Sequence, residues 1–355
     1  MSLIKKLTGK TDTEGKLLLN CPKFLESNLC YETYMGSTAY GVATDNSDAD
    51  IYGFCIPPKD MIFPHLNGEI MGFGRQHKRF EQYQQHHIKD GEVEYDFAIY
   101  GIVKYFQLCM ENNPNMIDSL FTPENCVTHS NEIGMMVRDA RKGFLHKGSW
   151  HKYRGYAHKS LHKMKSKNPK GLTELEEFSA KHDIPASLKL EDVTLEIYRQ
   201  SLGSPSSFGC TMSLDELKEY ETLLKTSSKR AVLINKFGYD TKYAYHTVRL
   251  LNQVEQIMAE GDMDLQRSRE QLKEIRRGEW SHKRIADYFE AKSKSLEELY
   301  ASSKLRHTPD EETIKQLLLN CLEHHYGNLS KCVVIQDKYE QALKDIQCRI
   351  EKTLV

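Results

Sequence analysis

Residues 35–51 limit the fold of this chain more than any other stretch of its sequence. They read Met-Gly-Ser-Thr-Ala-Tyr-Gly-Val-Ala-Thr-Asp-Asn-Ser-Asp-Ala-Asp-Ile and follow an apolar, aromatic run at residues 31–34. The run predicts a strand that leads into the pair Gly36-Ser37, where a short helix begins. Residues 49–56 predict a second strand, because their apolar run stops at a Pro-Pro pair. With the helical segments that follow, the chain is predicted to be a small domain of strands and helices followed by a helical domain, within the α+β class.

Asp48 and Asp50 have the spacing of two carboxylates on one face of a strand. Successive side chains of a strand point to opposite faces, so Ala49 and Ile51 turn the other way. Mg²⁺ prefers oxygen ligands and keeps coordination positions for substrate phosphates. A pair of metal ions can stabilise both the attacking and the leaving oxygen in phosphoryl transfer. We therefore expect Asp48 and Asp50 to be catalytic and to bind two ions of Mg²⁺ or Mn²⁺.

Gly36 and Ser37 are candidates for binding the phosphates of a nucleotide. The backbone N–H groups at the start of a helix have no partner within the helix, and the helix dipole favours negative charge there. We expect these two residues to hold the β- and γ-phosphates of a triphosphate.

A third carboxylate is expected on a neighbouring strand. Residues 92–97 alternate acidic and apolar side chains, which is typical of a half-buried strand and places Glu92, Glu94 and Asp96 on one face. Asp96 is the first candidate for a catalytic metal ligand, and Glu94 is the alternative on the same face. From Ile99 the apolar spacing becomes helical, and the proline of Asn113-Pro114-Asn115 should end that helix.

The rest of the chain is predicted to be mainly helical. Helices are expected at residues 239–258, with Asp240 as the N-cap, at 269–277 and at 310–326. Residues 171–230 are rich in Lys, Glu and Ser and predict a peripheral insert. The sequence thus predicts a catalytic domain at residues 1–135 and a helical domain at 136–355.

One segment, residues 138–170, is strongly basic. It has eleven Lys and Arg residues and a single acid, Asp139. Trp150, Tyr153 and Tyr156 lie among them, so the segment could follow a phosphate backbone and stack bases, and RNA is a possible partner. The alternatives are a solvated helix face and, for residues 155–157, simple packing.

Two further groups of side chains are possible site residues. Lys242, His246 and Arg249 share one helical face. If this face turns toward the site, Lys242 and Arg249 would bind the triphosphate, and His246 would protonate pyrophosphate or donate a hydrogen bond. The alternative is a solvated basic stripe. His86 and His87 are not expected to share a metal, because adjacent side chains of a strand point to opposite faces.

Composition limits the partners and the cellular compartment that we expect for the protein. The net charge of −1 gives no overall attraction to nucleic acid or to an acidic membrane. Nine cysteines form no CxxC pair, no stretch approaches the length of a membrane span, and the first residues lack a signal-peptide pattern. We expect a reduced, cytoplasmic protein with no membrane contact, while its oligomeric state stays open.

Several segments resemble the RNA-repair-pathway family of the DNA polymerase beta superfamily of nucleotidyltransferases, found in bacteria and phages. The superfamily motif is Gly-Gly/Ser followed, near a dozen residues later, by Asp/Glu-x-Asp/Glu. The similar segments are residues 34–41, 47–54, 56–58, 63–64, 104–106, 113–115, 155–157, 238–251 and 275–280. The family's third carboxylate lies four residues before a Tyr, which corresponds here to Asp96 before Tyr100.

The resemblance implies a polymerase-beta-like core, a small mixed sheet with helices, followed by a mainly helical C-terminal domain. It also implies a metal-dependent enzyme that transfers NMP from an NTP to an acceptor hydroxyl and releases pyrophosphate. An RNA end is the favoured acceptor. Transfer to a protein or a small molecule is one alternative, and an inactive nucleic-acid-binding protein is the other.

Overall fold

The protein is described here from a computed structural model of the whole chain. The residues that the structure describes are 2–44, 47–63, 70, 72–74, 79–165, 170–182, 184, 190–202, 212–226, 234 and 236–327. Asp45 and Asn46 of the motif lie outside them.

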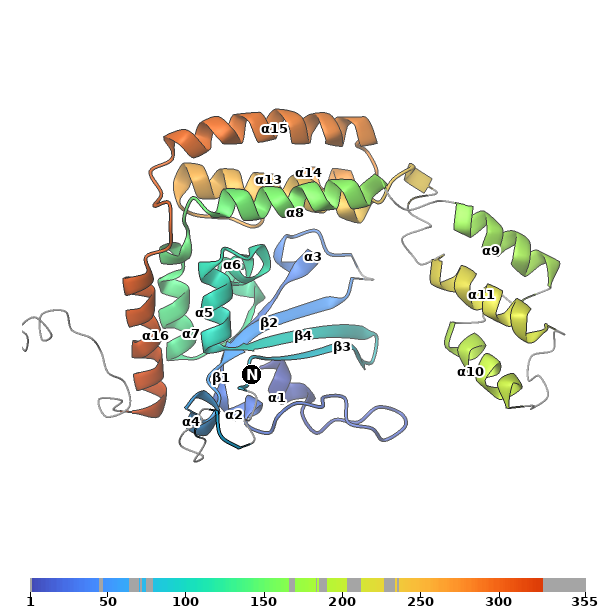
Figure 1. Cartoon of the computed structure of the whole chain (residues 1–355), viewed down its shortest axis with the longest axis horizontal. Helices are drawn as coiled ribbons and strands as arrows, with labels where there is room; N and C mark the ends of the chain where they lie inside the picture. Colours follow the sequence, from blue (N-terminus) through green and yellow to red (C-terminus); the bar gives the residue numbers. More distant parts are fainter. Residues whose placement is uncertain are drawn as a thin grey trace, which may run out of the picture.

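A five-stranded mixed sheet forms the centre of the N-terminal half (Figure 1). The strand order is β3-β4-β2-β1-β5, with β2 and β4 parallel and the other neighbours antiparallel. The strands are β1 Leu29–Tyr34, β2 Ala49–Cys55, β3 Gln82–Asp90, β4 Val93–Gly101 and β5 Val127–Ser130. The predicted α+β class with a small mixed sheet is therefore confirmed.

The helices that the structure describes surround this sheet or stack beyond it. In the first part of the chain they are α1 Leu3–Leu7, α2 Leu25–Asn28, α3 Gly36–Ala39, α4 Lys59–Ile62, α5 Ile102–Met110, α6 Pro114–Leu120 and α7 Glu132–Asp139. In the second part they are α8 Ser149–Lys165, α9 Lys170–Lys181, α10 Leu190–Ser201, α11 Leu214–Thr226, α13 Thr241–Glu260, α14 Arg269–Arg276, α15 His282–Ser302 and α16 Glu311–Tyr326. None of the described helices combines the length and the apolar character that crossing a membrane requires.

The alternation of β2 separates its two faces as the sequence predicted. Ala49 and Ile51 are buried in a core with α1 and α2, whereas Asp50 and Tyr52 are only partly buried. Gly53 lies against β1 so closely that an added Cβ would be 2.1 Å from the backbone oxygen of Tyr31. The strand therefore keeps a glycine where two backbones meet.

The core on the other face of the sheet continues into the helical half. It joins Phe54 and Tyr100 of the sheet to Val248 of α13 and Leu296 of α15. The proposed domain boundary at residue 135 lies inside α7, whose Ile133 and Val137 belong to the same core. The division into 1–135 and 136–355 stays a prediction about folding units, since no break in the described core marks it.

The capped helix predicted near residue 239 is present as α13. The Asp240 side chain accepts hydrogen bonds from the backbone N–H groups of Lys242 and Tyr243, at 2.9 and 3.2 Å. Gly261, at φ 61°, ends the helix in the left-handed conformation. Helices α14 and α16 also match the predicted ones, while the sequence analysis did not identify α15.

Two boundaries differ from the sequence prediction. The helix expected from Ile99 begins at Ile102, because β4 continues to Gly101 and is paired on both sides, with β2 and β3. Sheet pairing here overrides the helical spacing of the side chains. Pro114 does not only end α5. It is the first residue of α6, capped by Asn113, a position where proline loses no hydrogen bond.

The predicted insert at residues 171–230 contains α9, α10 and α11. Its buried side chains form a core separate from the two sheet cores: Phe178, Ile184, Val193, Met212, Leu217 and Tyr220. In Figure 1 these helices lie beyond the end of α8, away from the sheet. The insert therefore builds its own small packing unit.

Candidate active site

A cavity of about 360 Å³ lies between the sheet and α13. All eight predicted site residues line it: Gly36, Ser37, Asp48, Asp50, Asp96, Lys242, His246 and Arg249. The sequence analysis gave no site role to the other lining residues: Met35, Tyr40, Thr44, Ser47, Tyr52, Asn115, Tyr245 and Arg276. The cavity thus unites the motif at residues 35–51, a distant strand and a helix of the C-terminal half.

Asp50 and Asp96 form the centre of this cavity. They are direct register partners on the parallel strands β2 and β4, so their side chains project from the same face. Burial raises the pKa of Asp50, the charge of Lys242 opposes this, and the charges of Asp96 and Asp48 raise it further. The three carboxylates are therefore close enough to repel one another.

Such a set of carboxylates fits a magnesium ion. Burial is the main cause of the raised pKa of Asp50, and a bound cation would offset both this cost and the smaller repulsion from Asp96 and Asp48. Among the residues that the structure describes, no group of three or more His, Cys, Asp and Glu side chains is arranged so that it could hold a metal ion by itself, so substrate oxygens or water would have to supply further ligands. Mg²⁺ commonly binds through one or two carboxylates together with substrate phosphates and water, so the arrangement suits this ion.

The Asp50 carboxylate leaves no room for a side chain at position 36. Its φ is +59°, and an added Cβ would lie 1.9 Å from Oδ2 of Asp50. The backbone N–H of Met35 donates to the carbonyl oxygen of Asp50 at 2.7 Å, which joins the start of α3 to β2. Glycine is therefore needed here for space as well as for conformation.

Asp96 is held by the neighbouring hairpin strand. The backbone N–H of His87 donates to its Oδ1 at 2.8 Å, and Nδ1 of His86 lies 3.4 Å from its Oδ2. The alternative carboxylate, Glu94, does not line the cavity and lies 2.5 Å from Nδ1 of His87. Glu92 lies in the turn before β4. The structure thus brings Asp96, and not Glu94, to Asp50.

The prediction that His86 and His87 point to opposite faces is wrong. The register between β3 and β4 shifts between Gln85 and Ile88, and His87 has a φ of +59°. This bulge breaks the simple alternation, so both imidazoles reach carboxylates on the same face of β4. The hydrogen bond to Glu94 raises the pKa of His87.

The basic face of α13 is not a solvated stripe. Lys242 is exposed and His246 partly buried, but Arg249 is only 5% exposed. Its guanidinium lies 4.2 Å from the centre of the Tyr40 ring, and its Nη1 hydrogen-bonds to Oδ2 of Asp118. Tyr40 donates to the same carboxylate oxygen at 2.7 Å. Although burial lowers the pKa of Arg249, Tyr40 and Asp118 raise it on balance.

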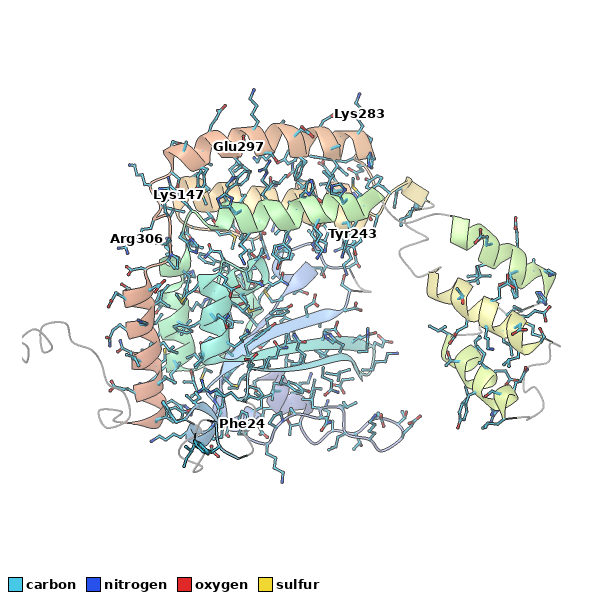
Figure 2. The ribbon with its side chains drawn as sticks, in the orientation of Figure 1. Phe24, Lys147, Tyr243, Lys283, Glu297 and Arg306 are labelled. Atoms are coloured by element: carbon cyan, nitrogen blue, oxygen red, sulfur yellow. The ribbon has the colours of Figure 1, made fainter. Side chains whose placement is uncertain are left out.

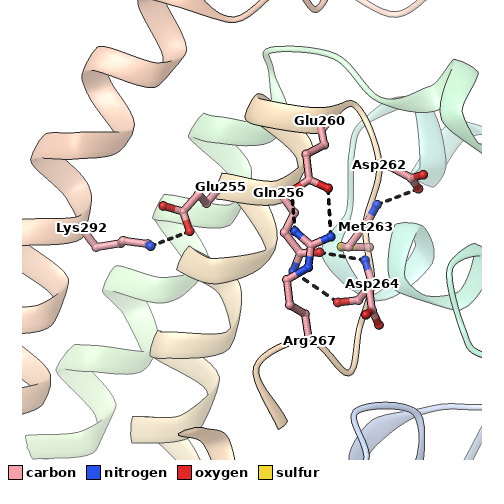
Figure 3. Close-up of polar contacts among 8 residues, drawn as sticks. All are labelled: Glu255, Gln256, Glu260, Asp262, Met263, Asp264, Arg267 and Lys292. Carbon is pink, nitrogen blue, oxygen red and sulfur yellow. Dashed lines mark hydrogen bonds and ion pairs between the residues drawn. The ribbon is translucent and has the colours of Figure 1, made fainter. Parts of the chain in front are cut away.

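The segment that runs from the end of α13 through α14 contacts the short helix α3 and the residues just after it. Figure 3 shows its internal contacts, in which the Gln256 side chain bonds both backbone groups of Asp264, at 2.8 and 3.2 Å. Just beyond, Gln266 donates to the carbonyl oxygen of Ala39 at 3.2 Å. Arg276 donates to that of Val42 at 2.5 Å. The helical half therefore fixes the position of α3.

The sequence only weakly indicated that Arg276 lines the site. It lies in residues 275–280, one of the segments that carry the family resemblance, but periodicity alone gives an arginine on a charged helix no role. Asn115 and Tyr52 were missed for a similar reason, since an amide and a phenol are common on strands and helix starts.

In the basic segment at residues 138–170, the prediction that its aromatic rings could stack on bases is wrong for two of the three rings. Trp150 and Tyr153 are 4% and 0% exposed, so these rings belong to the core and cannot stack on bases. Lys147 is buried too, and its backbone N–H donates to the carbonyl oxygen of Arg306 (Figure 2). Tyr156 is 45% exposed. The structure does not describe the side chains of residues 165–170, the last part of this segment.

Comparison with known proteins agrees with this geometry. The model of the RNA repair pathway DNA polymerase beta family matches residues 18–325. The family match and the fold are thus those of a polymerase-beta-like nucleotidyltransferase. More narrowly, the chain belongs to the RNA repair pathway DNA polymerase beta family.

Two individual proteins show weaker similarity. An uncharacterized 38.9 kDa protein of the nrdC-mobD intergenic region of Enterobacteria phage T4 is 26% identical over 135 residues. That match spans 37% of this chain and 37% of the phage protein. A nucleotidyltransferase-like protein from Exiguobacterium sibiricum superposes with a TM-score of 0.24 at 9% identity, covering 85% of this chain and 86% of its own. A TM-score this low adds nothing to the family assignment.

Proposed function

We propose that the protein transfers a nucleoside monophosphate from an NTP to an acceptor hydroxyl, with an RNA end as the acceptor. In this reaction the acceptor oxygen bonds to the α-phosphorus, the bond from that phosphorus to the β-phosphate oxygen breaks, and pyrophosphate leaves. The observation that carries the proposal is the register pairing of Asp50 with Asp96 beside Asp48, in the same cavity as Gly36 and Ser37.

The carboxylates have the role of metal ligands in this proposal. Asp48 and Asp50 would hold two Mg²⁺ or Mn²⁺ ions, and Asp96 would bind the one nearer the acceptor. When bound, the ions would neutralise charge that develops on the phosphoryl oxygens. The Asp96 carboxylate would also accept the proton of the acceptor hydroxyl, in the orientation fixed by His86 and the backbone N–H of His87.

The remaining lining residues would bind and orient the nucleotide. Gly36 and Ser37 would face the β- and γ-phosphates, as would the ammonium of Lys242, which is exposed and close enough to Asp50 to affect its pKa. His246 would hydrogen-bond or protonate the leaving pyrophosphate. Arg249 lines the same cavity but is paired with Asp118, so we assign it the task of holding α13 over the carboxylates.

An RNA acceptor is favoured by the exposed part of the basic segment. Lys159 and Lys163 are exposed on α8, on the same helix as Tyr156. Lysines in such positions attract a phosphate backbone without selecting a sequence. The burial of Trp150 and Tyr153 limits base stacking on this helix to fewer rings than the sequence indicated.

The first test is transfer of label from each α-³²P-NTP, supplied separately with Mg²⁺ or Mn²⁺. Acceptors are total RNA, DNA and a protein extract. We expect label in RNA, and none with the double variant Asp48→Asn/Asp50→Asn. Removing metal ligands should lower the rate by orders of magnitude. Label in protein instead would refute the RNA acceptor, and equal label with the variant would refute the assignment of the site.

A further inference from the structure

A second cavity, of about 200 Å³, adjoins the first. The two share the wall formed by Asn115, His246 and Arg249. Beyond this wall the second cavity is bounded by Tyr156 and Ser160 of α8 and by Asn113 at the cap of α6. The second cavity therefore lies next to the cavity that contains the three carboxylates and the start of α3.

The lining of the second cavity differs in chemistry from that of the first. No carboxylate is among its described lining residues, whereas the first cavity has three. Pro114 and Leu250 give it apolar walls, and Asn113, Asn115 and Ser160 offer neutral hydrogen-bonding groups. The charge of Arg249 in the shared wall is already paired with Asp118. Such a surface suits a flat, uncharged ring with polar edges better than it suits a phosphate or a metal ion.

Tyr156 gives this cavity an aromatic face. Its neighbour one turn earlier, Tyr153, is fully buried, yet Tyr156 is 45% exposed at the cavity edge. Single-stranded nucleic acids bind proteins by stacking bases on such rings. The cavity is smaller than the ~300–1,000 Å³ typical of sites for whole drug-sized ligands, so it suits one ring system.

We propose that the second cavity binds a nucleobase, stacked on Tyr156, with its edge hydrogen-bonded by Asn113, Asn115 and Ser160. This inference rests on the proposed function, because the second cavity shares a wall with the cavity that the carboxylates line. The base comes from one of two sources. It belongs to the incoming NTP or to the terminal nucleoside of the RNA acceptor.

The test compares equilibrium binding to the full-length protein and to its variant Tyr156→Ala, with Mg²⁺ present. The probes are each NTP, inorganic triphosphate and a single-stranded oligoribonucleotide with a free 3′-hydroxyl. We expect Tyr156→Ala to weaken the binding of a base-containing probe roughly tenfold, because stacking is lost. The affinity for inorganic triphosphate should stay unchanged. Tyr156→Phe keeps the ring and should restore binding.

A matched control separates stacking from general effects. Tyr198 on α10 is 63% exposed and lines neither cavity, so Tyr198→Ala should bind every probe as the unsubstituted protein does. Weaker NTP binding in Tyr156→Ala assigns the cavity to the NTP base. Weaker oligoribonucleotide binding with unchanged NTP binding assigns it to the acceptor.

Two outcomes would overturn the inference. One is unchanged binding of both base-containing probes, and the other is an equal loss for inorganic triphosphate. Failure of the proposed function looks different, since the unsubstituted protein would then bind neither triphosphate nor NTP. In that case the oligoribonucleotide alone decides whether the cavity takes a base.

Discussion

Arg249 of α13 and Asp118 of α6 form an ion pair in the interior, with side chains 6% and 0% exposed. Tyr40, the C-cap residue of α3, donates to the same carboxylate oxygen. Three segments that are far apart in the chain therefore meet at one buried carboxylate. This pair lies between the candidate active site and the core, and it determines how α13 is placed.

Breaking this pair should cost much more than breaking a surface pair. Asp118→Ala leaves the Arg249 guanidinium buried without its partner, and we expect a loss of about 3–5 kcal/mol in the free energy of unfolding. Urea denaturation measures it. The partly exposed pair of Lys292 and Glu255, with side chains 18% and 41% exposed, is the control, and Lys292→Ala should cost no more than about 1 kcal/mol. Similar losses for both variants would contradict the structural role of Asp118.

Gly36 should not tolerate even a methyl group. Gly36→Ala would place Cβ 1.9 Å from the Asp50 carboxylate at a φ of +59°, so the carboxylate or the backbone must move. We expect transfer to fall by at least tenfold and stability to fall by about 1–3 kcal/mol. Activity assays and thermal unfolding measure the two effects.

Gly155 provides the matched control for this substitution. It lies inside α8 with no atom within 4 Å of an added Cβ. Alanine is favoured over glycine by about 0.5–1 kcal/mol inside a helix, so Gly155→Ala should stabilise the protein. If both variants behaved alike, the space requirement at Gly36 would be refuted.

His325 should make stability depend on pH. Burial lowers its pKa from the usual value, and the neighbouring His324 lowers it further. The folded state thus favours the neutral ring, so stability is complete above the unfolded-state pKa and is lost as pH falls below it toward the folded-state pKa. His325→Gln should lose less stability on acidification than the unsubstituted protein. Measuring unfolding at about pH 8 and about pH 5.5, on either side of the ordinary histidine pKa, compares them, and parallel losses would contradict this prediction.

Lys159 and Lys163 should contribute to RNA binding through charge. The double reversal Lys159→Glu/Lys163→Glu should weaken binding and make it less sensitive to salt. The slope of log affinity against log salt concentration should fall by roughly one for each phosphate that is no longer neutralised. Fluorescence anisotropy at several salt concentrations measures both effects. Lys283 points outward from α15 (Figure 2), so Lys283→Glu is the control. An unchanged salt slope in the double variant would exclude this face as the RNA-binding surface.

The sequence was informative where spacing determines geometry. A two-residue period predicted that Asp48 and Asp50 lie together, and both line the cavity. The preference of helix starts for a side-chain acceptor predicted Asp240 as an N-cap, which is confirmed. Both depend on local rules that neighbouring elements do not change. Asp96 was identified from strand alternation and from the family pattern, and its pairing with Asp50 needed the strand order.

The failures have a common physical cause, because each depended on partners distant in the chain. The bulge at His87 is a property of two paired strands, and nothing in residues 82–90 alone sets it. The burial of Trp150 and Tyr153 follows from packing of α8 against α13 and the core. The continuation of β4 past Ile99 depends on two flanking strands. The charge and periodicity of one segment do not reveal which distant elements pack against it or pair with it.

The contacts between the helical half and α3 have a consequence for substrate exchange. Gln266 and Arg276 hold the backbone around α3, and Arg249 is paired in the interior. A rotation that moved α13 away from the sheet would break all three connections, including one that is costly to break. Nucleotide entry and pyrophosphate release through such a rotation would therefore be slow. These connections favour a cavity that keeps its width, so in the proposed reaction substrates would enter and leave without a separation of α13 from the sheet.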